Sequence, residues 1–379
     1  MRNPRGRPPA LALAMILIAT TLSLNACDGV PSTLRKPDMT ALSPRLQPLF
    51  GKTKTVCFGQ FVLDLPATAA VVYGPAEIDA DINRYPGDAR KIEEYVNERL
   101  KKIEEDRDLI LLDAKEQILG NGSMYGKVID GAVPGQKQVI GASQGAYRIH
   151  SYVPIGRDIF VLESSHINPK GDELQREITH INTVATRLRG RADDEVPSEP
   201  GSCIDGGFVA GPAEFENVTL GVRLSEFPDV HFSIRVSKNL LYLSEVSELE
   251  SRLKRGEQAA RLEGDGAFYA RIKFFRRAPR KLGAWNGFEA LARKPARKDA
   301  SESHEFLCYS IGALNDTLQP VLDVQLDTGV QGNSSAGKPP SITDEEAVAL
   351  WDKLLGSLRP RPAGPKTSAP IASQAATKH

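Results

Sequence analysis

The sequence has few of the residues from which common metal and cofactor sites are built. Its 379 residues include only 4 cysteines and 6 histidines, with no Cys-x-x-Cys or His-x-x-x-His pair. Because such spacings are typical of zinc sites, we expect no metal ligands. No Walker motif occurs, and the glycine-rich stretch 120–126 misses the dinucleotide pattern by one residue. We interpret that stretch as a β-turn and expect no cofactor.

An excess of charge of either sign is also absent. The 48 basic residues are balanced by 48 acidic ones, and no basic cluster stands out along the chain. Proteins that bind nucleic acid normally carry a basic patch that faces the phosphates. The composition therefore argues against a nucleic-acid partner.

Long apolar runs are missing everywhere except at the N-terminus. Residues 10–24 are apolar apart from threonines and a serine, and three arginines precede them. A run of about 15 residues is short for a bilayer span of about 20, but it fits a secretory signal. The run ends in Leu24-Asn25-Ala26-Cys27, which is similar to the lipobox of bacterial lipoproteins. We predict a lipoprotein signal peptide over 1–26; an ordinary signal peptide with a chance cysteine is the alternative.

Cleavage before Cys27 would leave 353 residues with lipid on Cys27 and a net charge of −3. Such a lipid anchors a protein to a membrane without spanning it. Asp28 resembles the signal that retains enteric lipoproteins at the inner membrane. We therefore expect a periplasmic protein anchored to a membrane by its N-terminal lipid, with the inner membrane favoured.

Breaker-rich segments divide the mature chain. A stretch rich in Pro, Ser and Thr predicts a flexible tether over 27–51, and a proline-rich tail predicts disorder over 362–379. The segment 189–202, with two prolines and four acidic residues, is the best domain boundary. A mature chain of this length suggests two domains, which we place at 52–192 and 200–361.

The two halves show similar patterns of secondary structure. Period-2 alternation, as in 230–236, predicts strands, and apolar stripes at helical spacing, as in 92–103, predict helices. Thr343 and Glu346 form a capping box at the start of the closing helix. We predict an α+β fold of two similar domains, each an antiparallel sheet packed against helices. The other predicted strands are 58–66, 147–153, 159–162, 268–275, 285–291, 306–311 and 321–326, and the other predicted helices are 174–188, 246–253 and 343–358.

Three cysteines remain after lipidation, and the oxidising periplasm favours a disulfide. Of the three possible single pairings, we favour Cys57–Cys203, because Cys57 opens the first strand and Cys203 lies where the linker enters the second domain. Cys308 lies within a strand pattern and is expected to be a buried free thiol.

One motif suggests catalysis. Residues 141–145 match Gly-x-Ser-x-Gly, the nucleophile elbow of α/β-hydrolases, with Ser143 as the nucleophile. The elbow needs a helix after the serine, but 146–153 has the periodicity of a strand, and no downstream histidine has a supporting motif. We interpret the motif as a hairpin turn and predict no catalytic residue. A lipoprotein esterase using Ser143 remains the alternative, and a structural envelope lipoprotein is a third hypothesis.

Three segments resemble one family. They are Val56–Pro66 (VCFGQFVLDLP) with Tyr73-Gly74 after it, Pro200–Phe208 (PGSCIDGGF), and Leu350–Arg361 (LWDKLLGSLRPR). In this order they are similar to the immunity proteins for type VI secretion lipase effectors. The resemblance spans about 52–361.

The resemblance implies a function. Members of this family reside in the periplasm and block the active site or the lid of a phospholipase effector, gripping it with two α+β domains. Cys308 departs from the family's pattern. Inhibition without chemistry requires a tight interface with a few aromatic or Arg anchors. The segments 73–86 and 312–320 are the candidate contact loops, and the expected partner is a cognate phospholipase effector.

Overall fold

Alternation of apolar and polar residues builds the centre of the main sheet. Strand β14 (His231–Ser237) buries Phe232, Ile234 and Val236 and leaves the residues between them partly exposed.

The computed structural model describes residues 39–241, 248–332 and 334–362. The predicted signal peptide 1–26, Cys27, Asp28 and the tail beyond residue 362 lie outside the described residues.

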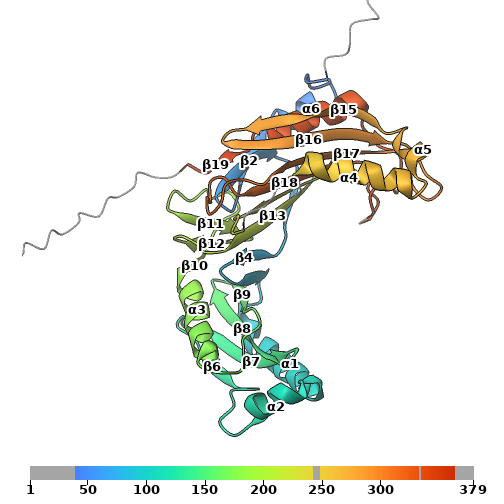
Figure 1. Cartoon of the computed structure of the whole chain (residues 1–379). Coiled ribbons are helices and arrows are strands. Elements are labelled where there is room, and N and C mark those ends of the chain that lie inside the picture. The colour runs from blue at the N-terminus through green and yellow to red at the C-terminus, as the bar shows by residue number, and fades with distance from the viewer. Residues whose placement is uncertain (1–38, 242–247, 333, 363–379) are drawn as a thin grey trace, which may run out of the picture. The chain divides into compact units, whose positions relative to one another are not determined.

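The described residues form one large antiparallel sheet in the order β15-β16-β17-β18-β14-β13-β4-β5-β9-β8-β7-β6, with β3 also paired to β13 (Figure 1). The strands are β3 (Ala70–Tyr73), β4 (Ala76–Ile78), β5 (Asp81–Tyr85), β6 (Val128–Asp130), β7 (Lys137–Ser143), β8 (Ala146–Ile155), β9 (Asp158–Glu163), β13 (Glu216–Arg223), β15 (Lys273–Leu282), β16 (Trp285–Lys294), β17 (Ser303–Ser310) and β18 (Val321–Asp327). Strand β13 joins the halves, because it pairs with β14 on one side and with β3 and β4 on the other.

Two small sheets lie beside this one. One is ordered β1-β2-β19 and the other β10-β12-β11. Their strands are β1 (Thr53–Phe58), β2 (Phe61–Pro66), β19 (Arg359–Pro360), β10 (Leu188–Gly190), β11 (Gly201–Ile204) and β12 (Gly207–Ala210). The first sheet joins the beginning of the folded chain to its end.

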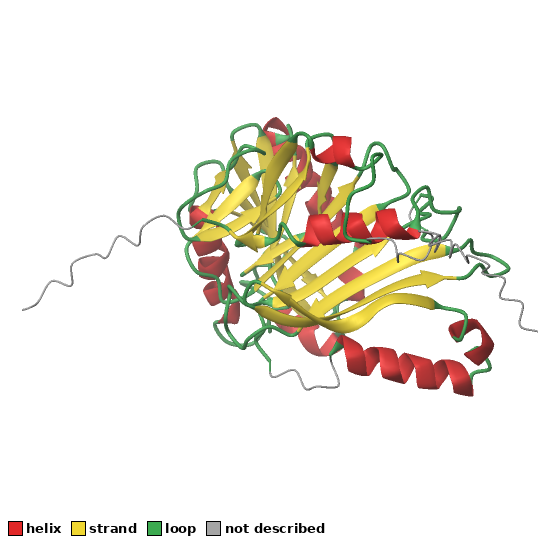
Figure 2. Cartoon of the chain, turned by 90° about the horizontal axis from the view of Figure 1, so that it is seen from above, coloured by secondary structure: helices red, strands yellow, loops and turns green. Residues whose placement is uncertain are grey.

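The helices are α1 (Ile92–Glu105), α2 (Leu112–Leu119), α3 (Glu173–Arg187), α4 (Leu249–Leu262), α5 (Gly266–Tyr269) and α6 (Asp344–Leu355), with short 3-10 helices at Gln47–Phe50, Ala89–Lys91 and Arg107–Leu109. The Thr343–Glu346 capping box is present, and α6 buries Trp351 against Phe306 of β17. Helix α4 contacts the opposite face of β17, on the side of Leu307 (Figure 2).

The predicted α+β class with antiparallel sheets packed against helices is confirmed. Because β13 carries the sheet from one half into the other, the division into two similar domains at 52–192 and 200–361 stays a prediction.

Two local predictions are wrong. The strand predicted over 268–275 begins only at Lys273, because Asp265 accepts backbone hydrogen bonds from Phe268 and Tyr269 and starts the short helix α5. The tether predicted over 27–51 is too long at its C-terminal end. Leu46 and Leu49 are buried in the core, and Ser43 donates a hydrogen bond to Glu346 at 2.7 Å, so the chain is already packed there.

Candidate functional site

Ser143 lies in a hairpin, as interpreted from the sequence. It ends β7, and Gln144 and Gly145 turn the chain into β8 with positive φ angles of 52° and 80°. A nucleophile elbow requires a helix at this point. The hollow of about 330 Å³ beside Ser143 is lined by residues 106, 109–111 and 142–144, among which there is no histidine. The geometry therefore lacks the base that a serine nucleophile needs.

A hydroxyl–histidine–carboxylate series does occur elsewhere. His304 Nδ1 lies 3.0 Å from Thr328 Oγ1, and its Nε2 lies 3.0 Å from Asp344 Oδ1. Burial lowers the pKa of His304, so the neutral ring is favoured. The Thr328 and His304 side chains are almost fully buried, and the Thr328 hydroxyl also accepts the His304 backbone N–H. No substrate can reach this hydroxyl; the series fastens the start of α6 to the sheet.

Cys57 and Cys203 are joined by a disulfide, with their Cα atoms 5.8 Å apart. Gly59 and Cys203 also exchange two backbone hydrogen bonds of 2.8 Å, which tie the end of β1 to β11. Both cysteines are completely buried. Cys308 is a buried free thiol, and burial raises its pKa to about 12, so it is not a nucleophile.

The predicted linker 189–202 folds around one arginine. Arg191 is buried and donates to the carbonyl oxygens of Ala192, Glu195 and Ile204 at 2.9–3.2 Å. It also donates to the Tyr73 hydroxyl at 3.1 Å, which in turn donates to the Cys57 carbonyl at 2.7 Å. Sequence reasoning missed Arg191, since an arginine among acidic residues and prolines looks solvated.

Arg84 supplies a second connection across the middle of the chain. Its guanidinium pairs with Asp158 at 2.7 Å and with Asp205 at 3.1 Å. Asp205 belongs to the Pro200–Phe208 segment, as Tyr73 belongs to the earlier one. The structure thus brings together the motifs that carry the resemblance, and their side chains form hydrogen bonds and ion pairs within the fold. We call the region around these residues the junction: Cys57, Cys203, Tyr73, Arg84, Arg191 and Asp205.

One of the two candidate contact loops is not a loop, and its contact with a partner stays a prediction. Residues 73–86 contain β4 and β5, which lie inside the main sheet. The turn between them holds Asp79, whose carboxylate accepts the backbone N–H groups of Glu214 and Phe215 at 2.7 and 2.9 Å and pairs with Arg187 at 3.0 Å. These bonds hold the partly buried turn in place, so it is not a free loop.

The other candidate loop, 312–320, lies at the surface between β17 and β18. Leu314 and Leu318 are 53% and 49% exposed. Asn239, which follows β14, accepts the Asn315 backbone N–H at 2.8 Å, and this brings Leu240 and Leu241, 40% and 73% exposed, to the same end of the sheet. We call these four residues the C-terminal leucine cluster.

A second apolar surface lies in the first half. Leu109, Leu111 and Leu112, at the start of α2, are 73%, 53% and 87% exposed. Leu109 and Leu111 also line the hollow beside Ser143. We call these three residues the N-terminal leucine cluster. Contiguous exposed apolar side chains are typical of interaction surfaces. The run Leu109-Ile110-Leu111-Leu112 was the available sequence signal, but apolar residues are usually assigned to the core.

The part of the chain that the structure describes contains no group of three or more His, Cys, Asp or Glu side chains that could hold a metal ion. None of its helices is long and apolar enough to cross a bilayer. The described residues thus form an α+β protein with two exposed apolar clusters, and its polar side chains at the junction are hydrogen-bonded within the fold.

Comparison with known proteins supports the resemblance. Residues 195–363 match the Tle cognate immunity protein 4 C-terminal domain. The immunity protein TplEi of the type VI secretion system from Pseudomonas aeruginosa, solved with an "L" peptide, is similar to the chain with a TM-score of 0.61 and 25% identity, covering 83% of this chain and 99% of that one. The C-terminal part of the chain is thus similar to a domain of the type VI secretion immunity proteins, as the resemblance predicted.

Two further structures share the fold. TplEi in its apo form has a TM-score of 0.63, and the Tle4–Tli4 complex has one of 0.64; each is 22% identical to the chain and covers 82% of it and 98% of the matched chain. No curated protein matches the chain in sequence.

Proposed function

We propose that the chain is a periplasmic lipoprotein that binds a type VI secreted phospholipase and inhibits it by occluding the active site. The observation that carries the proposal is the match of residues 195–363 to the Tle cognate immunity protein 4 C-terminal domain, together with a related fold solved as a Tle4–Tli4 complex. The arrangement of side chains is consistent with it, because Ser143 lacks a base and the His304 series is closed to substrate. Nothing in the geometry favours the esterase alternative.

The two leucine clusters are the surfaces through which such binding would act. A stable protein interface buries roughly 1,600 Å² in total and depends on a few apolar anchors at its centre. The N-terminal cluster offers three exposed leucines, and the C-terminal cluster offers four. An effector that covers both clusters would be held by both halves of the chain, with its active site closed against the surface between the contacts.

Co-purification with a phospholipase effector of the same cell tests the proposal. The protein should form a stable complex and suppress hydrolysis of phospholipid vesicles by the lipase in a stoichiometric manner. A complex that leaves hydrolysis unchanged would contradict occlusion. Failure to bind any type VI lipase of that cell would contradict the partner. Ser143→Ala should leave inhibition unchanged.

The lipid anchor is a separate part of the proposal. Eleven residues separate Cys27 from the first described residue, Met39, a span of at most about 40 Å when extended. Such a tether would hold the protein beside the bilayer that the effector attacks. Cys27→Ser should leave binding in solution intact and weaken protection of living cells. Equal protection by the variant would show that the anchor is dispensable.

A further inference from the structure

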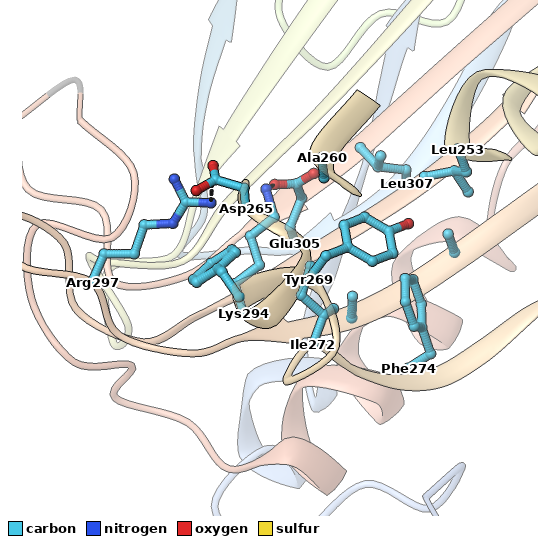
Figure 3. Close-up of a pocket in the computed structure, with 13 residues that line it drawn as sticks. Leu253, Ala260, Asp265, Tyr269, Ile272, Phe274, Lys294, Arg297, Glu305 and Leu307 are labelled. Atoms are coloured by element: carbon cyan, nitrogen blue, oxygen red, sulfur yellow. Dashed lines mark hydrogen bonds and ion pairs between the residues drawn. The ribbon is translucent and has the colours of Figure 1, made fainter. Parts of the chain in front are cut away.

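A slot runs beneath α4 and α5, above β15, β16 and β17, with a volume of about 230 Å³ (Figure 3). Small side chains create it: Ala260 on α4 faces Ala290 and Ala292 on β16. The slot is a groove open to solvent, since Leu253, Phe268 and Phe274, which line it, are only partly buried. A small molecule can therefore enter it without a rearrangement of the fold.

The two ends of the slot differ in chemistry. Leu253, Leu307 and Phe274 lie at one end (Figure 3). At the other end, Arg297 pairs with Asp265 at 3.6 Å, and Lys294 pairs with Glu305. The Arg297 and Asp265 side chains are 51% and 60% exposed, so water and ligands can reach them. The slot is thus amphipathic along its length.

Tyr269 lies between these ends, with its hydroxyl directed toward the apolar end (Figure 3). The hydroxyl oxygen is buried and has no hydrogen-bond partner. A buried polar group without a partner is destabilising, because it has given up its hydrogen bonds to water. The protein alone therefore leaves this part of the slot without its full set of interactions.

We propose that the slot binds the acyl chain of a single-chain amphiphile, a fatty acid or a lysophospholipid, with its charged head at Arg297 and Lys294. Both signs of charge are present at that end, so an anionic or a zwitterionic head is accommodated. The volume corresponds to about seven or eight groups of the size of a water or a methylene, at ~30 Å³ each. Such amphiphiles are the products of phospholipid hydrolysis. The proposal requires no effector and is independent of the inhibition proposed above.

Calorimetric titration of the purified protein, without effector, tests this. The probes are hexanoate, octanoate, dodecanoate and 1-lauroyl-lysophosphatidylethanolamine, each below its micelle concentration. We expect one saturable site whose affinity rises about fourfold per methylene up to about eight carbons and then levels off. The tighter of the two head groups identifies the natural class. No saturable binding of any probe, or an affinity that continues to rise at the same rate to twelve carbons, overturns the slot.

A matched pair of variants locates the site. Ala260→Trp fills the slot and should weaken octanoate binding at least tenfold, whereas Ala259→Trp, on the exposed side of the same helix, should bind as the unmodified protein does. Unchanged octanoate binding by a folded Ala260→Trp protein overturns the proposal. If that variant does not fold, the chain-length series decides, and an affinity that continues to rise at the same rate to twelve carbons overturns the proposal.

Discussion

The junction and the two leucine clusters differ in the burial and bonding of their side chains. At the junction, Cys57, Cys203 and Arg191 are buried, and the arginine is bonded to the backbone around it. In the clusters, Leu112 and Leu241 are 87% and 73% exposed. The segments that carry the resemblance lie at the junction, and the clusters lie outside them. Those segments therefore report the fold, whereas the clusters are the surfaces that we propose for binding an effector.

The largest expected effect falls on the junction. The disulfide closes a loop with a sequence separation of 146 residues, for which the chain-entropy model gives about 5 kcal/mol. Cys57→Ser with Cys203→Ser should lower the free energy of unfolding by an amount of that order, measured by urea denaturation. Reductant should have the same effect on the unmodified protein. The folded fraction should still bind the effector, so a loss below about 1 kcal/mol, or a loss of binding alone, would break the comparison.

Substitutions in the clusters should weaken effector binding and leave stability unchanged, which is the opposite of the result expected at the junction. Leu111→Asp with Leu112→Asp in the first half, and Leu314→Asp with Leu318→Asp in the second, place charges where an apolar contact is proposed. We expect each pair to weaken effector binding by about 2–4 kcal/mol, the range of interface hot spots. Stability should stay within about 0.5 kcal/mol, because these side chains are exposed. Calorimetry and urea denaturation measure the two effects.

Leu262 offers a matched control for the clusters. It is 89% exposed at the end of α4, outside both clusters. Leu262→Asp should leave binding unchanged, which would show that the effect depends on position and not on any lost leucine. If only one cluster responds, one half of the chain carries the contact. If neither responds, the clusters are ordinary surface and the interface lies elsewhere.

Local patterns predicted the elements that depend on local physics. The alternation in 230–236 predicted β14, and Thr343 with Glu346 predicted the start of α6. The strands predicted over 147–153 and 159–162 are present as β8 and β9, and the turn between them holds Gly156 with a φ of 62°. These signals lie within a few residues of one another, so they can be found in one sequence.

The remaining features depend on residues that are far apart in the chain. The turn at Asp79 looked like a loop, but it is held by backbone groups of Glu214 and Phe215, more than 130 residues away. The pairing of β13 with β3 and β4 joins the halves in the same way. The N-terminal leucine cluster was missed because sequence shows that a residue is apolar without showing whether a partner or the core covers it.

A smaller, pH-dependent effect on stability is expected at the junction and not in the leucine clusters. Glu216 is buried at the junction, where Gln60 donates to its carboxylate at 2.9 Å, and burial raises its pKa above the ordinary 4.5. The folded state therefore holds this proton more tightly than the unfolded state. Its contribution to stability is fully present below pH 4.5 and is lost as the pH rises through the folded pKa.

Glu216→Gln has the same size and no charge to bury, so it should be more stable than the unmodified protein at neutral pH and equal to it below pH 4.5. Urea midpoints measured from pH 4 to pH 8 give this difference. Effector binding should be the same for both proteins across that range, since Glu216 lies at the junction and not in a leucine cluster. A stability difference that does not change with pH would show that the carboxylate is not the cause, and altered binding would place the junction inside the interface.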